Sequence, residues 1–140
     1  MVRVNLLNPK NLTDQHLMAE YYEILMLSTY IKKHPSLDNI PKEYILSKGH
    51  MRFFKDKIKY LKNRHDKIVR EMKKRGFKPK KSFSLKGFKK TALKDWKPNI
   101  KDKKLIKKRI IERINLKPEF YKYYKKPRTK SFLVSLIKKS

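Results

Sequence analysis

Apolar residues recur every three or four positions, the spacing of an amphipathic helix, in three long stretches of this chain. The first stretch predicts a helix over residues 14–33, with Thr13 as its N-cap. The helix is expected to end before His34-Pro35, because a proline disfavours helical geometry in the preceding residue. Its core-facing positions include Leu17, Met18, Tyr21 and Leu25.

The other two stretches predict helices over residues 50–75 and 101–117. Gly76 follows the second as a left-handed stop, and Pro118 follows the third. The apolar stripe of the second helix is Phe54, Ile58, Leu61, His65, Ile68 and Met72, and the buried row of the third is Ile106, Ile110 and Ile114. Within that stripe, His65 is interpreted as a packed histidine rather than a ligand. Phe53 beside Phe54 is likewise interpreted as core.

The segments between and after these helices are rich in lysine. Residues 77–98 predict a loop, either solvated or following a phosphate backbone. Trp96 could stack on a base, but packing onto the core is the expected role. Residues 127–140 form a basic extension that either docks as a short fourth helix or remains a mobile tail. The predicted fold is all-α, a compact single domain of three main helices with the N-terminal segment packed between them and a basic C-terminal tail.

Charge favours a nucleic-acid partner. The net charge is +28 over 140 residues. Residues 1–50 hold six Lys/Arg and five Asp/Glu, a net +1, whereas residues 51–140 hold 34 and seven, a net +27. No apolar stretch approaches the roughly 20 residues of a membrane span, and no signal peptide is visible, so an intracellular protein without membrane association is expected. There is no cysteine, and the four histidines lack the HExxH spacing of a zinc site, so we expect no metal and no cofactor.

The N-terminus offers a nucleophile. Val2 follows the initiator Met and is small enough for aminopeptidase to expose its α-amine. Such an amine has a pKa of about 7.7–8.0, so part of it is unprotonated at neutral pH. His16, Glu20 and Glu23 lie on one face of the first helix. A carboxylate beside an amine can support Schiff-base chemistry, although solvated acids on a surface helix would show the same pattern.

Four ordered blocks of the sequence carry a resemblance to a known family. They are Arg3–Leu6 with Asp14–Glu23 (RVNL and DQHLMAEYYE), Tyr44–Leu46 with Gly49–Lys57 (YIL and GHMRFFKDK), Lys74–Phe77 (KRGF) and Phe120–Lys125 (FYKYYK). Together they closely resemble the phage pyrimidine-dimer DNA glycosylases, also called phage endonuclease V. The resemblance implies that residues 1–126 form a glycosylase-like domain. It also implies double-stranded DNA with damaged pyrimidines or abasic sites as the partner of a monomeric enzyme.

The resemblance further implies a reaction in which the Val2 amine attacks the deoxyribose of a damaged pyrimidine, above all a UV-induced cyclobutane dimer. Glu23 would stabilise positive charge on the sugar and assist proton transfers, and β-elimination would then nick the strand. Arg3, Gln15 and His16 would hold the phosphate and sugar. The surrounding positive charge is expected to lower the pKa of both the amine and the carboxylate.

Further DNA contacts are expected towards the C-terminus. Arg109, Arg113 and Lys117 recur every four residues, and their mutual repulsion favours an anionic partner. The resemblance places basic residues at matching positions. By the same resemblance, Tyr121, Lys122 and Tyr124 are expected to contact DNA, whereas Phe120 and Tyr123 are expected to close the core.

Two positions depart from the family pattern. Tyr22 stands where the family usually has an arginine, and Met26 where it has another basic residue. Tyr22 could stack on the DNA and Met26 could act as an apolar wedge, yet neither replaces a bidentate phosphate contact. The preferred lesion could therefore be an oxidised or ring-opened pyrimidine, or an abasic site. The competing classes are a non-catalytic basic DNA-binding protein and an RNA-binding or ribosome-associated module, both of which would gain by replacing Glu20 and Glu23 with lysine.

Overall fold

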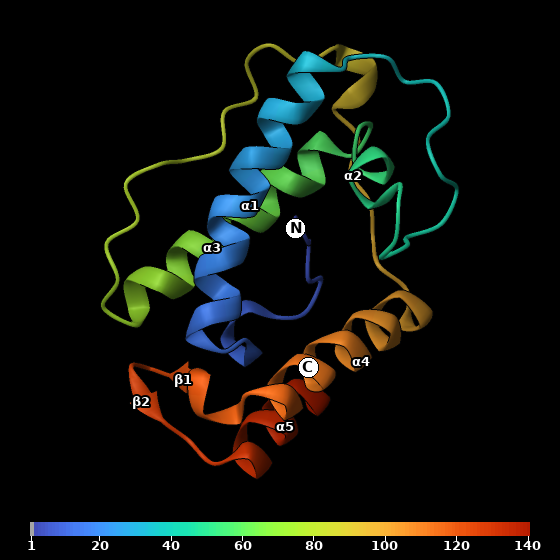
Figure 1. Ribbon diagram of the computed structural model, residues 1–140. Coiled ribbons are helices and arrows are strands. Elements are labelled where there is room, and N and C mark those ends of the chain that lie inside the picture. Colours follow the sequence, from blue (N-terminus) through green and yellow to red (C-terminus); the bar gives the residue numbers. More distant parts are fainter. Residues whose placement is uncertain (1) are drawn as a thin grey trace.

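The computed structural model describes residues 2–140, which are mostly helical (Figure 1). The long helices are α1 (Asp14–Lys33), α3 (Ile58–Lys74) and α4 (Ile100–Leu116). The shorter elements are η1 (Pro9–Asn11), α2 (His50–Phe53), η2 (Lys90–Ala92), η3 (Pro118–Phe120), β1 (Lys122–Tyr123), β2 (Lys126–Pro127) and α5 (Lys130–Lys138). α1 packs along α3, and α4 packs along α5. The predicted all-α domain is confirmed.

The first helix has the predicted bounds. The hydroxyl of Thr13 accepts a hydrogen bond from the backbone N–H of His16 at 3.1 Å and so caps α1. At the other end, the backbone N–H of His34 donates to the carbonyl of Tyr30 at 3.0 Å, and the chain then leaves the helix before Pro35. Local sequence is sufficient to place both ends of this helix.

The second predicted helix is interrupted, so a single helix over residues 50–75 is wrong. α2 ends at Phe53, and α3 begins at Ile58. Between them Lys57 leaves helical geometry and pairs with Leu93 in an antiparallel bridge. Phe53 and Phe54 are both fully buried. Adjacent residues on one helix point about 100° apart, so the turn allows both rings to enter the core.

The remaining helix ends agree closely with the predicted ones. Gly76, with φ +88°, ends α3 as a left-handed residue, and the backbone N–H of Phe77 donates back to the carbonyl of Met72. α4 begins with a reciprocal capping box between Asn99 and Asp102. The predicted buried row of α4, Ile106, Ile110 and Ile114, is confirmed.

The C-terminal segment forms a short hairpin and then a helix. Residues 130–138 form α5, whose Leu133 and Ile137 are buried, so this part of the extension docks against α4. Phe120 was expected to close the core, but 58% of its surface is exposed. In η3 its ring packs edge-on against Tyr121, with ring centres 5.1 Å apart, instead of entering the core. Tyr123 is partly buried, as expected, beneath the Arg75 guanidinium at 4.7 Å.

The lysine-rich stretch over residues 77–98 crosses the molecule anchored by aromatic side chains. Phe83 is buried and lies 6.3 Å from His65, which is itself fully buried. The backbone N–H of Lys81 donates to the hydroxyl of Tyr21 at 2.8 Å. Trp96 is partly buried against Phe53 and its neighbours, as predicted. These contacts fix the course of the loop backbone, and therefore the positions from which its lysines extend.

The N-terminal segment runs between α1 and α4 (Figure 1). Val2, Val4, Leu6 and Leu7 are all buried. Leu6 has φ +58°, a conformation that β-carbon-bearing residues rarely adopt and that the surrounding packing must hold. Within residues 2–140, no helix is both long and apolar enough to cross a membrane.

Candidate active site

The N-terminal segment meets the first helix at Glu23. The backbone N–H of Arg3 donates to Oε1 of Glu23 at 2.8 Å, across 20 residues of chain. The Arg3 guanidinium folds back and donates from Nη1 to the Val2 carbonyl at 2.7 Å. Val2 is therefore held one residue from the Glu23 carboxyl, and the roles of nucleophile and acid–base partner stay predictions.

Tyr44 and His50 hold the next residue of this segment. The backbone N–H of Val4 donates to Nε2 of His50 at 3.0 Å, and the hydroxyl of Tyr44 donates to the Val4 carbonyl at 2.7 Å. Nδ1 of His50 lies 2.6 Å from the Ile45 carbonyl, so the proton of the neutral ring resides on Nδ1. Burial lowers the pKa of His50 to about 4. Neither residue was predicted from the sequence to act in the site, although both fall in a block that resembles the family.

The low pKa of His50 predicts that the free energy of unfolding falls in acid. The pKa of His50 lies below its unfolded value of about 6.5, so the unfolded chain binds the proton more readily, and stability falls as pH drops from 6.5 towards 4. We expect protonation linked to His50 alone to lower the free energy of unfolding by about 2 kcal/mol between pH 7 and pH 5. Urea unfolding at both pH values should show this loss, and His50→Gln should flatten the dependence by a similar amount. An unchanged dependence in the variant would mean that other groups cause the acid sensitivity.

Glu23 has a raised pKa, contrary to the sequence-based prediction. Burial of the half-buried carboxyl raises the pKa, and the hydrogen bond from the Arg3 N–H opposes this only in part. The negative charge of Glu20 raises the pKa further, whereas Arg109 lowers it. Loss of water around the carboxyl thus outweighs the positive field. The result is a carboxyl better suited to exchange protons near neutral pH.

Glu20 belongs to the core rather than to the site. Its carboxylate accepts two hydrogen bonds from Arg64, from Nε at 2.7 Å and from Nη2 at 2.9 Å, and both side chains are buried. Arg64 also donates to the carbonyl of Leu7 and so holds the N-terminal segment from behind. Of the two acids on this helix face, Glu23 alone borders Val2 and Arg3.

Arg109 faces the same site from α4. It is close enough to act electrostatically on Glu23, Arg3 and His16. Burial, and then the neighbouring Arg113, lowers the pKa of Arg109. Arg3 is within electrostatic reach of Arg109, Arg113 and Glu23, and its Nε is a buried donor that has no hydrogen-bond partner within residues 2–140. The site therefore presents Glu23 together with the nearby guanidinium groups of Arg3 and Arg109, an arrangement suited to a phosphate-bearing sugar.

His16 and Gln15 join the start of α1 to the C-terminal hairpin. The ring of His16 stacks on Tyr121, with ring centres 4.8 Å apart and planes within 4°. Burial lowers the pKa of His16 to about 4, so the ring is neutral at pH 7. Oε1 of Gln15 accepts a hydrogen bond from the backbone N–H of Lys122 at 2.8 Å. The structure thus brings together residues that the sequence separates by more than 100 positions.

A buried charge network fixes the same hairpin. Asp14 accepts from Nη1 of Arg75 at 2.9 Å and from the backbone N–H groups of Tyr124 and Lys125 at 3.1 and 2.7 Å. The Tyr124 hydroxyl donates to Glu71 at 2.9 Å, and Glu71 also pairs with Arg75. This network was not predicted from the sequence, because its members come from three separate segments of the chain. Tyr124 is held at the hairpin by its hydroxyl, whereas Lys122 is exposed.

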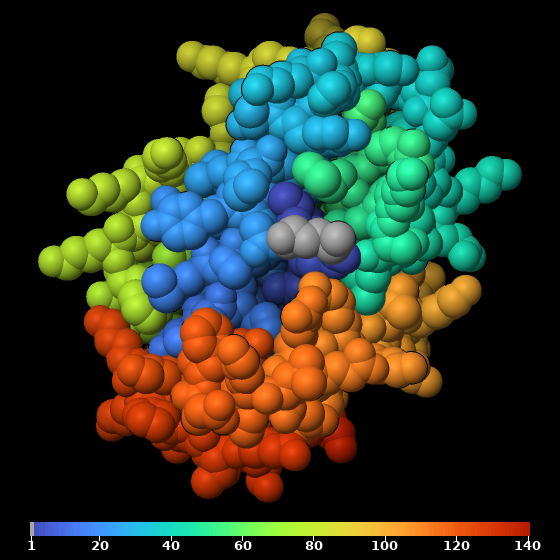
Figure 2. Space-filling view, viewed as in Figure 1, coloured from blue at the N-terminus to red at the C-terminus, as the bar shows by residue number. Residues whose placement is uncertain are grey.

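A cavity of about 380 Å³ opens beside Val2. Its lining includes Val2, Arg3, Tyr30, Lys48, His50 and Arg52. Figure 2 shows the N-terminal segment at the centre of this face, framed by α1, the segment around α2 and the C-terminal part of the chain. The residues around Val2 are therefore reachable from the surface of this face.

The family model for pyrimidine dimer DNA glycosylases matches residues 1–85 of the 140-residue chain. The chain belongs to this family. The matched part holds the N-terminal segment, α1, α2 and α3, and therefore Val2, Arg3 and Glu23. As a pyrimidine dimer DNA glycosylase, the protein is a DNA repair enzyme that acts on DNA. α4 and the hairpin lie beyond the matched residues.

In this pyrimidine dimer DNA glycosylase, the other predicted DNA contacts occupy exposed positions. Tyr22 and Met26 lie one turn apart on α1, with 58% and 59% of their surfaces exposed. Arg113 is exposed on α4, and Lys117 is the exposed residue that ends it. Arg113 is near enough to Arg109, Arg3 and Tyr121 to act on them electrostatically, so it extends the positive charge of the site.

Proposed function

We propose that the glycosylase removes a damaged pyrimidine through a Schiff base on the α-amine of mature Val2 and then nicks the strand by β-elimination. The observation that carries this proposal is the hydrogen bond from the Arg3 N–H to Glu23, which sets residue 2 beside a carboxyl with a raised pKa. Met1 lies outside the described residues. Its removal by aminopeptidase is part of the proposal.

The reaction starts at C1′ of the deoxyribose. The lone pair of the amine attacks C1′, the bond from C1′ to the base nitrogen breaks, and the base leaves and takes up a proton. The C1′–O4′ bond then breaks, O4′ takes up a proton, and a protonated imine forms between the amine nitrogen and C1′. A base next removes a proton from C2′, and the 3′ phosphate leaves as the C3′–O bond breaks. Water finally hydrolyses the imine and releases the amine.

Glu23 is proposed to act in both halves of this reaction. As a carboxylate it stabilises the positive charge that develops at the sugar, and it then transfers protons during ring opening and elimination. Arg3 bonds to it through its backbone N–H, Arg109 acts on it electrostatically, and both guanidinium groups are suited to the phosphates that flank the lesion. His16 is proposed to contact the sugar as a neutral ring, and Gln15 through the amide nitrogen left free by its bond to Lys122.

The proposed substrate is double-stranded DNA bound by a monomer. Arg113 and Lys117 extend the positive surface from Arg109 along α4. Lys122 and Tyr121 lie beside the start of α1, where the hairpin can meet the same DNA strand, and Tyr124 is proposed to contact DNA through its ring edge. Binding through these phosphate contacts should weaken steeply with salt.

Covalent trapping tests the proposed reaction. Mixing the processed protein with a duplex that holds one abasic site and then adding borohydride should reduce the imine to a stable protein–DNA adduct. Mass mapping should place that adduct on Val2. Protein that retains Met1 serves as the control and should form little adduct in total, because the nitrogen of Val2 is then an amide. An adduct on a lysine, or cleavage without any adduct, would exclude the α-amine as nucleophile.

Lesion choice is a separate question, which depends on Tyr22 and Met26. Both are exposed and apolar in part, and neither can hold a phosphate as a guanidinium does. An abasic site or an oxidised pyrimidine is therefore a second candidate substrate beside the cyclobutane dimer. Replacing both residues with arginine should raise dimer cleavage relative to abasic-site cleavage by about tenfold, the effect of one good charged contact.

The two substrates must be compared on matched duplexes at one salt concentration. The double variant Thr29→Arg/Asn63→Arg adds the same two charges at exposed positions of α1 and α3 and controls for a general gain in affinity. A cleavage ratio unchanged from the original protein would show that other residues recognise the lesion.

A further inference from the structure

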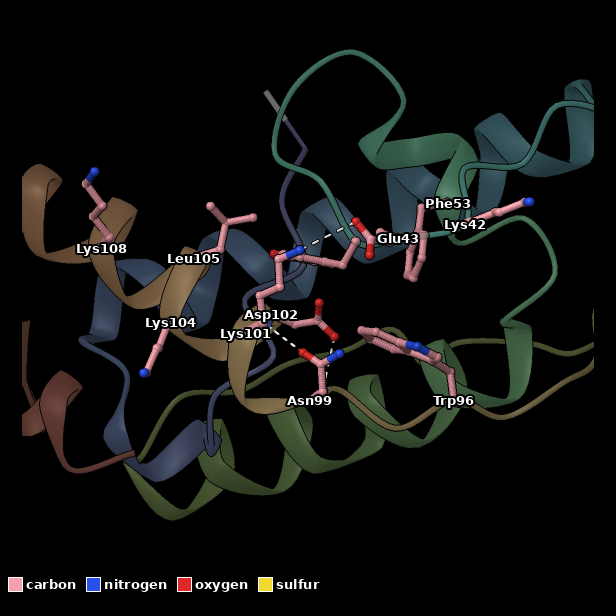
Figure 3. Close-up of a pocket in the computed structure, with 11 residues that line it drawn as sticks. Lys42, Glu43, Phe53, Trp96, Asn99, Lys101, Asp102, Lys104, Leu105 and Lys108 are labelled. Carbon is pink, nitrogen blue, oxygen red and sulfur yellow. Dashed lines mark hydrogen bonds and ion pairs between the residues drawn. The ribbon is translucent and has the colours of Figure 1, made fainter.

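A second cavity lies away from Val2, between the first half of α4 and residues 42–44. Its volume is about 330 Å³, within the range of about 300–1,000 Å³ typical of small-molecule sites. It shares no lining residue with the cavity beside Val2. Figure 3 shows Trp96 and Phe53 on one side of this cavity and Lys101 reaching towards Glu43.

The inner wall of this cavity is aromatic. Trp96 lies 5.0 Å from Phe53 in an edge-on arrangement, and 6.1 Å from Tyr44 with the two rings within 16° of parallel. Phe53 and Tyr44 are buried, whereas Trp96 is only partly buried. The packing behind Trp96 thus holds the ring in place while part of it faces the cavity. Trp96 is also the single tryptophan of the chain.

The rim of the cavity is positively charged. Lys42, Lys101, Lys104 and Lys108 line it, against the two acids Glu43 and Asp102. One carboxylate oxygen of Asp102 is engaged in capping α4, where it accepts the Asn99 N–H at 3.0 Å. Glu43 lies 3.6 Å from Lys101, and both side chains are at least 75% exposed, so this ion pair is weak and readily opened. The rim therefore offers lysines to an anion.

Lysines around an aromatic wall are suited to bind a nucleotide whose base is not paired or stacked in a duplex. In a duplex the bases are stacked and paired, so lysines can reach the phosphates but the base cannot enter a cavity. Single-stranded sites combine basic grooves with aromatic rings on which bases stack. α4 also connects the two sites, since Lys108 lines this cavity while the next residue, Arg109, faces Glu23.

We propose that this cavity, the Trp96 cavity, binds an unpaired nucleotide of single-stranded DNA. The base lies against Trp96, and Lys101, Lys104 and Lys108 hold the adjoining phosphates. This site gives the enzyme a contact for unpaired DNA in addition to the damaged duplex. The proposal is independent of the chemistry proposed for Val2 and Glu23, because it requires only binding.

Tryptophan fluorescence provides the test, because Trp96 is the only emitter of its kind. Titrating the full-length protein with a ten-residue oligothymidylate at fixed salt should quench Trp96 emission and protect it from iodide. An undamaged duplex at equal phosphate concentration should quench it much less. Lys104→Ala/Lys108→Ala should weaken binding of the single strand by about tenfold and leave cleavage of an abasic-site duplex within about twofold.

Two further variants sharpen this result. Lys59→Ala/Lys73→Ala removes the same charge from exposed positions on α3 and should weaken the single strand by less than about threefold. Glu43→Gln removes an acid from the rim and should tighten single-strand binding. The proposal would be overturned if the two double lysine variants lost equal affinity for the single strand. It would also be overturned if the single strand bound without any change in Trp96 emission. Equal quenching by duplex and single strand would likewise overturn it.

Discussion

Replacing Glu23 with glutamine is expected to lower glycosylase turnover by about 100-fold or more while leaving binding of damaged duplex intact. Glutamine keeps the size of the side chain and an oxygen that can accept the Arg3 N–H. It lacks the negative charge that stabilises the cationic sugar and the capacity to exchange a proton. Single-turnover excision on a lesion-containing duplex, with the dissociation constant measured in parallel, separates these effects.

The raised pKa of Glu23 adds a second readout. In the original protein, protonation of the Val2 amine should lower the rate first as the pH falls below about 8. A second acid-side step should follow at a pH above the ordinary glutamate value of about 4.3, because the carboxyl must be ionised to stabilise the sugar cation. Glu23→Gln should lose this acid-side step. A variant with near-original turnover would assign catalysis to another group. The step would then also have to persist in Glu23→Gln.

Replacing Glu20 with glutamine is expected to act on stability instead, lowering the free energy of unfolding by about 3 kcal/mol. The change leaves the buried Arg64 guanidinium without its carboxylate partner, and breaking a buried pair from one side typically costs 3–5 kcal/mol. Glutamine retains one hydrogen-bond acceptor, so the lower end of that range is expected. Urea unfolding at pH 7 measures the loss.

A double variant and the turnover of Glu20→Gln show whether Glu20 acts through its buried ion pair with Arg64 or in the reaction itself. Glu20→Met/Arg64→Met removes both charges together and should be more stable than Glu20→Gln, because no unpaired charge stays buried. Turnover per folded molecule of Glu20→Gln should remain near that of the original protein. The pKa of Glu23 should fall in Glu20→Gln, since a neighbouring negative charge is removed. A 100-fold loss of turnover at full folding would instead place Glu20 in the reaction.

Local features of the sequence were sufficient to place most of the helices. Thr13 and Pro35 bound α1, Gly76 ends α3, and the isoleucine row of α4 faces inwards, because caps, breakers and periodicity depend on neighbours within a few residues. The interruption between α2 and α3 was not predictable in this way. It depends on Lys57 pairing with Leu93, a partner 36 positions further along the chain.

The sequence by itself also determined the chemistry available to this protein. A small residue after Met1, acids on one face of the first helix, and positive charge concentrated after residue 50 are all readable without coordinates. Its four family-like blocks pointed to a DNA glycosylase, and the family match over residues 1–85 agrees.

Only the tertiary structure separated the two acids of α1. Glu20 and Glu23 lie on one face of the helix, yet Arg64 of α3 buries Glu20 in a pair while the N-terminal segment brings Arg3 to Glu23. The direction of the Glu23 pKa was likewise decided by packing, because desolvation depends on which segments cover the carboxyl and outweighs the charge that composition reveals. Helical spacing reports which residues share a face, and only the fold determines what that face meets.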